Sequence, residues 1–141
     1  MKKNKNGFTL IEILVTMTIV AILMGISLVS LQGARKVARD GKRKADLEQI
    51  RSALEIYRSD CHAYPANTGL LEGADCDISG TTEVYLEVVP EDPIPDSYNY
   101  YYSGVDNSYT LCAYLETGGT VVSCGGECGT GITCNYKVSN Y

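Results

Sequence analysis

An apolar stretch near the start, residues 8–31, constrains the fold of this 141-residue chain more than any other feature. Glu12 is its only charged residue, and the stretch contains no proline. As a helix rising about 1.5 Å per residue it is roughly 36 Å long, enough to cross a hydrocarbon core of about 30 Å. A carboxylate inside lipid costs about 2–3 kcal/mol or more without a partner, so we expect Glu12 to have a specific role.

Three ordinary interpretations of this stretch compete. A secretory signal peptide has an apolar core of about 7–15 residues before a small-residue cleavage site; here the core is longer and carries an acid, although Ser30 and Gly33 mimic such a site. A plain membrane anchor explains the length but neither Gly7 nor Glu12. A buried helix of a soluble protein is not normally apolar on every face. The motif that opens the stretch favours a fourth interpretation.

That motif reads Gly7-Phe8-Thr9-Leu10-Ile11-Glu12 and follows the basic leader MKKNKN. It resembles the class III signal of the type IV pilin family, which includes type IV pilins and type II secretion pseudopilins. The resemblance implies an α+β fold in which a long N-terminal helix packs on a small antiparallel β-sheet head. It also implies that a prepilin peptidase cleaves between Gly7 and Phe8, and that the new amino group of Phe8 is methylated.

The chain is expected to have four parts. These are a cleaved leader (1–7), a membrane-spanning and filament-core half-helix (8–31), an amphipathic half-helix (32–60) and a disulfide-rich β head (61–141). Removing the three leader lysines takes the formal charge from −5 to −8. The basic leader favours a cytoplasmic N-terminus, whereas the bases after the apolar segment favour the reverse. Because all six cysteines lie beyond that segment and need an oxidising compartment, we place the head outside the cytoplasm.

Charge is distributed unevenly beyond the apolar stretch. Residues 35–58 carry eight Lys or Arg, whereas the chain from Ser59 onward carries twelve acids and one base, Lys137. An acidic head argues against a general phosphate-binding surface, so we expect no nucleic-acid partner. The bases between Arg35 and Lys44 are expected to be solvated or to contact lipid headgroups.

The helix is expected to continue past the apolar stretch and to end near Asp60 and Cys61, because Pro65 follows. The only histidine, His62, has no partner for catalysis or metal binding and is expected in an exposed loop. Apolar residues at helical spacing predict one buried face. They are Val37, Ala38, Leu47, Ile50, Ala53, Leu54 and Tyr57.

A small sheet is expected in the last third of the chain. Residues 97–102 and 108–115 alternate as strands do and are joined at 104–107, and residues 120–124 are expected to form a third strand. The run YLEVVPEDP at 85–93 is similar to the family's segment that leads into the sheet. The tyrosines crowded here suggest sugar binding or charge transfer, but amphipathic sheet packing is the commoner role.

Six cysteines predict three disulfides, for which 15 connectivities are possible. Proximity along the chain favours Cys61–Cys76, Cys112–Cys124 and Cys128–Cys134. The rival interpretation is a zinc site using the last three cysteines, which lack a CxxC pair and a nearby histidine.

Calcium needs separate consideration. The resemblance implies an acidic calcium-binding loop near the C-terminus of major pseudopilins, but residues 117–141 contain only Glu127 as an acid. Asp92, Asp96 and Asp106 offer oxygen ligands at spacings that match no calcium loop. We therefore expect no metal or cofactor, and this departure favours a pilus subunit over a secretion pseudopilin.

The sequence contains no nucleophile motif, phosphate-binding loop or paired histidines, so a structural subunit is expected rather than an enzyme. The favoured function is a pilin of a type IV pilus or pilus-like filament, in which Glu12 neutralises the Phe8 amino group of a neighbouring copy. The alternatives are a major pseudopilin of a type II secretion system and a DNA-uptake or adhesive minor pilin.

The resemblance implies partners and a location for such a subunit. The partners are further copies of the chain, a prepilin peptidase, an inner-membrane assembly platform with its ATPase, and membrane lipid before assembly. The subunit is expected first as a single-pass protein of the inner, cytoplasmic membrane and then in an extracellular or periplasmic filament.

Overall fold

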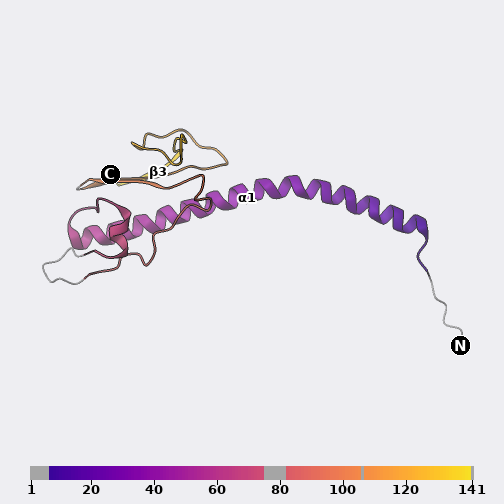
Figure 1. Cartoon of the computed structure of the whole chain (residues 1–141), viewed down its shortest axis with the longest axis horizontal. Helices are drawn as coiled ribbons and strands as arrows, with labels where there is room; N and C mark the ends of the chain where they lie inside the picture. Colours follow the sequence, from indigo (N-terminus) through magenta and orange to yellow (C-terminus); the bar gives the residue numbers. More distant parts are fainter. Residues whose placement is uncertain (1–6, 75–81, 106, 141) are drawn as a thin grey trace, which may run out of the picture. The chain divides into compact units, whose positions relative to one another are not determined.

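The computed structural model describes residues 7–74, 82–105 and 107–140, apart from the side chains of residues 28–30. The chain divides into two compact units, Met1–Lys36 and Val37–Tyr141, here called the N-terminal and C-terminal units. A long helix followed by an antiparallel sheet confirms the predicted α+β fold. The elements (Figure 1) are α1 (Leu10–Cys61), the 3-10 helix η1 (Thr68–Glu72), β1 (Tyr101–Val105), β2 (Ser108–Ala113) and β3 (Tyr136–Ser139).

Helix α1 ends through a residue in the left-handed conformation. His62 has φ 60°, and its N–H donates to the carbonyl of Arg58 at 2.9 Å. This hydrogen bond closes the last turn in the αL manner, and Pro65 soon afterwards prevents the helix from resuming. His62 is exposed, as predicted, and the structure gives it the additional role of ending α1.

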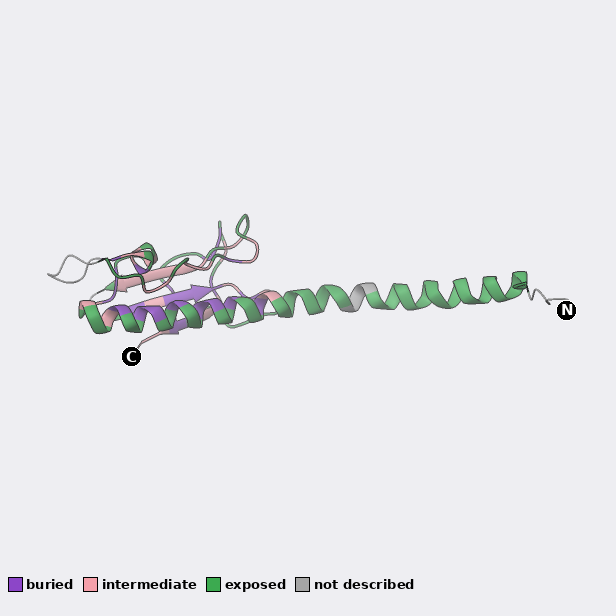
Figure 2. Cartoon of the chain, turned by 90° about the horizontal axis from the view of Figure 1, so that it is seen from below, coloured by how far each residue is buried: buried purple, intermediate pink, exposed green. Residues whose placement is uncertain are grey.

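One face of α1 is buried within the C-terminal unit, as Figure 2 shows. The predicted positions from Leu47 to Tyr57 lie on this face and are confirmed. Val37 and Ala38, which were expected to extend the face upstream, are exposed, Val37 by 62%. That part of the prediction was wrong because no described segment of the C-terminal unit covers this turn of the helix.

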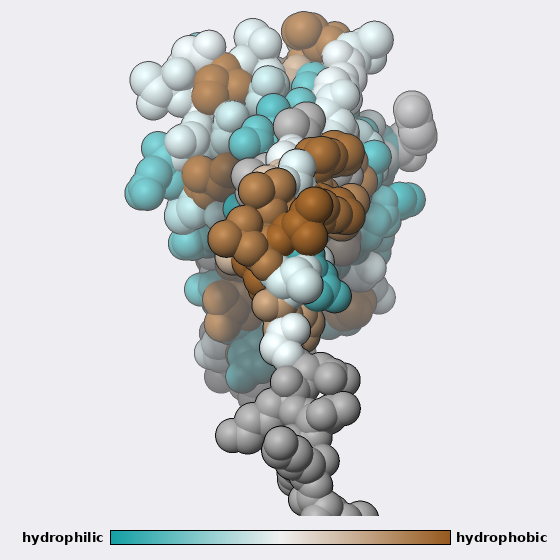
Figure 3. All heavy atoms as spheres, turned by 90° about the vertical axis from the view of Figure 1, so that its right-hand side faces the viewer, coloured by the Kyte–Doolittle hydropathy of each residue, from teal (hydrophilic) through white to brown (hydrophobic). Residues whose placement is uncertain are grey.

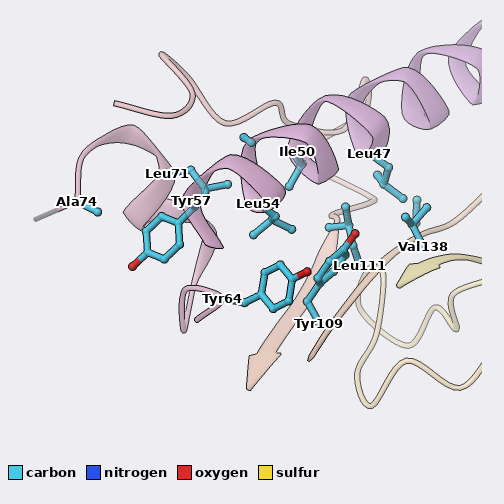
Figure 4. Close-up of a cluster of buried hydrophobic side chains, with 12 residues drawn as sticks. Leu47, Ile50, Leu54, Tyr57, Tyr64, Leu71, Ala74, Tyr109, Leu111 and Val138 are labelled. Carbon is cyan, nitrogen blue, oxygen red and sulfur yellow. The ribbon is translucent and has the colours of Figure 1, made fainter. Parts of the chain in front are cut away.

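Side chains from α1, η1 and the sheet form the main core (Figure 4). Leu54 and Leu111 are fully buried, and the Tyr64 and Tyr109 rings meet edge to face with centroids 4.8 Å apart. Full burial of a leucine contributes about 1.5–3 kcal/mol, so a few such residues hold the sheet on the helix. The labelled core residues are Leu47, Ile50, Leu54, Tyr57, Tyr64, Leu71, Ala74, Tyr109, Leu111 and Val138.

Strand β2 is central in the order β1-β2-β3, and both pairings are antiparallel. Strand β2 lies at its predicted position, whereas β1 begins four residues later than predicted and includes Gly104 and Val105, which were expected in the connection. The predicted third strand, residues 120–124, is not a strand, and β3 takes its place beside β2. The difference has a physical reason: β1 and β3 occupy both edges of β2, and β3 buries Val138, which pairs with Leu111.

The connection from β2 to β3, residues 114–135, contains neither helix nor strand. It is held instead by a second buried cluster made of the disulfides Cys112–Cys124 and Cys128–Cys134. The sulfurs of Cys112, Cys124 and Cys134 lie within 4.8 Å of one another, but in disulfides they offer no thiolate to zinc. Cys61 is also disulfide-bonded, and its expected partner Cys76 lies outside the described residues.

Removing the Cys112–Cys124 disulfide is expected to destabilise the C-terminal unit by about 3 kcal/mol, because the bond closes the longer of the two described loops. The double substitution Cys112→Ala and Cys124→Ala should therefore lower the urea midpoint of the full chain in detergent. The signal to follow is near-UV circular dichroism, since all eleven tyrosines lie beyond Lys36 and the chain has no tryptophan.

The matched control is Cys128→Ala with Cys134→Ala, which opens a shorter loop and is expected to cost about 2 kcal/mol. Equal midpoints for the wild type and the Cys112/Cys124 variant would contradict the role assigned to this disulfide.

Candidate functional site: helix start and ion network

The start of α1 is capped by the motif that marks the N-terminus. Thr9 precedes the first helical residue, and its Oγ1 accepts a hydrogen bond from the N–H of Glu12 at 3.3 Å. A threonine followed three residues later by glutamate is a capping box, so the TLIE run specifies where the helix begins. A negative side chain in the first turn also suits the positive end of the helix dipole.

The polar side chains described in the apolar half of α1 are satisfied within the helix. The hydroxyls of Thr16, Thr18 and Ser27 donate to the carbonyls of Ile13, Leu14 and Leu23 at 2.9, 2.7 and 2.8 Å. Such internal hydrogen bonds remove the cost of placing a hydroxyl in lipid. Among the described residues of the N-terminal unit before Arg35, Glu12 alone carries a charge.

Hydrophobic side chains of the N-terminal unit lie at the surface, from Phe8 (81% exposed) to Leu31 (46%). Figure 3 shows brown, hydrophobic spheres gathered on the face nearest the viewer. By length and composition, α1 is the one helix among the described residues that is able to cross a membrane. Exposed apolar surface of this extent requires lipid or other protein around it.

The predicted site residues at the N-terminus are Gly7, Phe8 and Glu12. Gly7 and Phe8 are exposed and precede α1, where a peptidase has access to the bond between them. The structure brings Thr9 and Glu12 together, but it places no charged partner beside the Glu12 carboxylate among the described residues. The positive partner expected for Glu12 is thus not among the described residues.

A second site, here called the ion network, lies in the C-terminal unit and consists of Arg39, Asp40, Arg43, Asp92 and Glu116. The Arg43 side chain is fully buried. Its guanidinium donates twice to Asp92, at 2.7 and 2.9 Å, and once each to Asp40 and Glu116, both at 2.9 Å. Arg39 donates twice to Glu116 at 2.6 Å. Two arginines thus hold three carboxylates between α1 and two loops.

Asp40 accepts further hydrogen bonds from the loop that follows β2. They come from the N–H of Glu116 at 2.9 Å and from the N–H and hydroxyl of Thr117 at 2.8 and 2.7 Å. Burial is the largest single influence on the pKa of Asp40 and raises it, but the hydrogen bonds from Thr117, Glu116 and Arg43 together lower it below its ordinary value.

The pKa of Glu116 is also lowered, mainly by its hydrogen bonds with Arg39. The desolvation of Arg43 opposes its charge, but hydrogen bonds to Asp92, Glu116 and Asp40 leave its pKa raised. The Tyr98 ring lies 4.9 Å from the Arg43 guanidinium and covers it. Asp40 and Glu116 therefore remain ionised beside the buried Arg43 guanidinium at neutral pH.

Sequence reasoning missed most of the ion network. Arg43 was expected to be solvated or to contact lipid headgroups, and this was wrong because the side chain is fully buried. One local signal pointed to it, since Arg43 lies four residues before Leu47 and therefore on the same helix face. Asp92 was considered only as a calcium ligand, whereas its two oxygens are engaged by Arg43.

The stability of the C-terminal unit is expected to fall at acid pH through Asp40 and Glu116. A carboxylate whose pKa is lower in the folded state stabilises the fold above its unfolded pKa, about 3.9–4.3, and loses this contribution as the pH drops through its folded pKa. The urea midpoint should therefore be flat between about pH 7 and pH 5 and should decline below about pH 4.

The comparison for this prediction is Asp40→Asn, which removes one titrating group. Its midpoint should be lower at neutral pH and should depend less steeply on pH below 4. An unchanged slope in this variant would contradict the contribution assigned to Asp40.

Comparison with known proteins places these features in a family. The prokaryotic N-terminal methylation motif matches residues 2–28, and the family described as type II secretion system (T2SS), protein G matches residues 30–125. No solved structure matches the chain significantly.

Curated relatives agree with the family match. The type II secretion system core protein G of Pseudomonas aeruginosa is 29% identical over 117 residues, which cover 78% of this chain and 82% of the relative. The protein of the same name from Vibrio cholerae is 28% identical over 129 residues, covering 83% and 86%. The type IV wide pilus major component PilA4 of Thermus thermophilus is 38% identical over 69 residues, covering 49% and 53%.

The match at the helix start and the match across the C-terminal unit lie on the two regions whose geometry is described above. The predicted membership of the wider pilin and pseudopilin group is confirmed. The chain belongs to the type II secretion system protein G family.

Proposed function

We propose that this chain is a major pseudopilin, the structural subunit of a type II secretion filament. The observation that carries the proposal is the exposed apolar half of α1, in which the described hydroxyls are satisfied internally and the one charge, Glu12, has no ion-pair partner among the described residues. Such a helix is stable in lipid and becomes more stable when a neighbouring copy supplies a positive group. Assembly into a filament provides that group.

The proposed sequence of events follows the N-terminal motif. A prepilin peptidase cleaves between Gly7 and Phe8, and the amino group of Phe8 is methylated. Phe8 then carries a positive charge about one helical turn from Glu12. In a stack of subunits, the Glu12 carboxylate of one copy neutralises the Phe8 amino group of the next, which favours one register because a lone charge in lipid is costly.

The proposed subunit is structural and has no catalytic role. Its partners are further copies of the chain, the prepilin peptidase, and an inner-membrane platform with its ATPase. We propose that the C-terminal unit lies outside the cytoplasm, because disulfides form in oxidising compartments. The subunit moves from the inner, cytoplasmic membrane into a periplasmic filament.

A pseudopilin now ranks above a pilus subunit, which reverses the order expected from the sequence. That order depended on the missing acidic calcium loop. In this chain the connection from β2 to β3 is held by two disulfides, and the loop after β2 is held by Asp40 and Arg43. Because these disulfides and hydrogen bonds already hold the connection between β2 and β3, the missing calcium loop is a weak argument against a pseudopilin. The match to PilA4 keeps a pilus subunit as the second candidate.

Two measurements on native cells test the proposal. The intact mass of the protein is expected to lack residues 1–7, to carry one added methyl group, and to rise by six hydrogens on reduction, one for each cysteine. Deletion of the gene is expected to block export of secreted proteins and to leave surface pili unchanged.

The outcomes separate the candidates. Loss of surface pili with normal secretion would favour the pilus subunit. An uncut N-terminus, or a cut beyond Leu31, would contradict filament assembly through α1.

A further inference from the structure

Residues 83–91, which lead from η1 toward the sheet, are anchored by hydrogen bonds, and successive pairs of their side chains are in turn exposed and packed against the core. Their backbone is fixed because the N–H groups of Tyr85 and Leu86 both donate to the carbonyl of Leu71 at 2.9 Å, and the N–H of Val89 donates to Glu72 at 2.8 Å. Tyr85, Leu86 and Val89 pack against the core. The remaining side chains form an exposed surface that we call the acidic ridge. It consists of Glu83, Val84, Glu87, Val88 and Glu91.

The acidic ridge has the composition of an interface. Val84 and Val88 are 60% and 68% exposed although the backbone beneath them is ordered. The three glutamates beside them have no ion-pair partner among the described residues. No lysine or arginine occurs between Arg58 and Lys137, so this part of the chain supplies no base to neutralise the ridge.

A complementary surface, here called the basic face, lies on the first turns of α1 in the C-terminal unit. It consists of Val37, Gly41, Lys42 and Lys44, all exposed. Val37, Gly41 and Lys44 follow one another at helical spacing, and Lys42 borders them. A Cβ placed on Gly41 meets no atom within 4 Å, so another backbone is able to approach closely there. Lys42 has no ion-pair partner among the described residues.

We infer that the acidic ridge of one subunit docks on the basic face of a second copy of this chain. The valines of the ridge meet Val37, and Glu87 and Glu91 approach Lys42 and Lys44. The inference rests on the proposed filament and identifies which surfaces of neighbouring C-terminal units touch. Charge complementarity identifies a second copy as the partner of the acidic ridge. C-terminal units with an excess of acids repel one another unless each faces the bases on its neighbour's helix.

Crosslinking from the ridge tests this contact in filaments of the full chain. A photoreactive p-benzoylphenylalanine at Val88 is expected to give a covalent dimer whose crosslink maps to residues 37–44 of the second copy. The same group at Val121, which is 73% exposed and lies on another segment, is the control and should give about tenfold less of this product. A crosslink from Val88 to any other region, or to another protein, would overturn the inference.

A charge exchange provides an independent test. Glu87→Lys and Lys42→Glu are each expected to reduce the yield of filaments by about tenfold, because attraction becomes repulsion at every subunit contact, and the double variant should recover most of it. Lys137→Glu and Asp96→Lys change exposed charges outside both surfaces and should leave the yield unchanged. Absence of recovery in the double variant would count against the contact, whereas absence of wild-type filaments would instead contradict the proposed function.

Discussion

Replacing Arg43 with alanine is expected to lower the free energy of unfolding of the C-terminal unit by about 3–5 kcal/mol. The substitution removes a fully buried cation and leaves the carboxylates of Asp40, Asp92 and Glu116 close together with only Arg39 to balance them. It also releases the bidentate link between α1 and the loop at Asp92. A domain with a total stability of about 5–15 kcal/mol loses a large share of it through such a change.

The measurement is urea unfolding of the full chain in detergent, followed by the near-UV circular dichroism of the tyrosines. Arg43→Lys is the informative companion, because lysine keeps the charge but not the two parallel hydrogen bonds to Asp92, and an intermediate loss is expected. Arg51→Ala is the matched control. Arg51 meets Glu48 at 3.5 Å on the exposed face of the same helix, and such pairs contribute about 0–1 kcal/mol. Similar losses for Arg43→Ala and Arg51→Ala would show that the ion network does not hold the unit together.

The helix and its buried face follow from local sequence, whereas the ion network does not. The helical spacing of Leu47, Ile50 and Leu54 alone predicts which face of α1 is buried. Arg43 lies on the same face, but an arginine is ordinarily solvated, and its partners are 49 and 73 residues away along the chain. Only the folded chain shows that Asp92 and Glu116 reach it.

Part of the sheet also follows from local sequence and part does not. Alternation places β2 correctly, but β1 is shifted toward the C-terminus and includes Gly104 and Val105, which the turn residues had assigned to the connection. Strand β3 has only four residues and pairs with β2 across a long irregular connection. Residues 120–124 alternate equally well, but β1 and β3 occupy the two edges of β2, so residues 120–124 have no edge of β2 to pair with. Alternation alone does not show which of two segments takes an edge.

The run that contains Glu12 has two roles, because it begins α1 and also supplies the charge that is expected to act in assembly. The carboxylate was expected to act in assembly, and the geometry at Thr9 shows that the same run of residues also begins the helix. A loss of filaments after changing Glu12 is therefore ambiguous unless the cap and the charge are separated. Glutamine is able to replace glutamate in a capping box but carries no charge.

Glu12→Gln is accordingly expected to weaken the association constant of each assembly step by about tenfold or more, equivalent to about 1.4 kcal/mol, and so to reduce filaments while cleavage at Gly7 continues. Without the carboxylate, joining the filament no longer neutralises the Phe8 amino group of the neighbouring copy, so the subunit gains less by assembling. Thr9→Ala is the matched control, because it removes the cap oxygen at a cost of about 1 kcal/mol but keeps the charge. Filaments should persist in that variant.

The readouts are the amount of sheared filament and the intact mass of the subunit, which reports cleavage and methylation separately from assembly. Normal filaments with Glu12→Gln would show that the charge is not needed, and their loss with Thr9→Ala alone would show that the Thr9 cap governs assembly. The pairing of Glu12 with the Phe8 amino group of a neighbour would then have to be abandoned, and the drive for assembly would have to come from the exposed apolar surface of α1 and from contacts between C-terminal units.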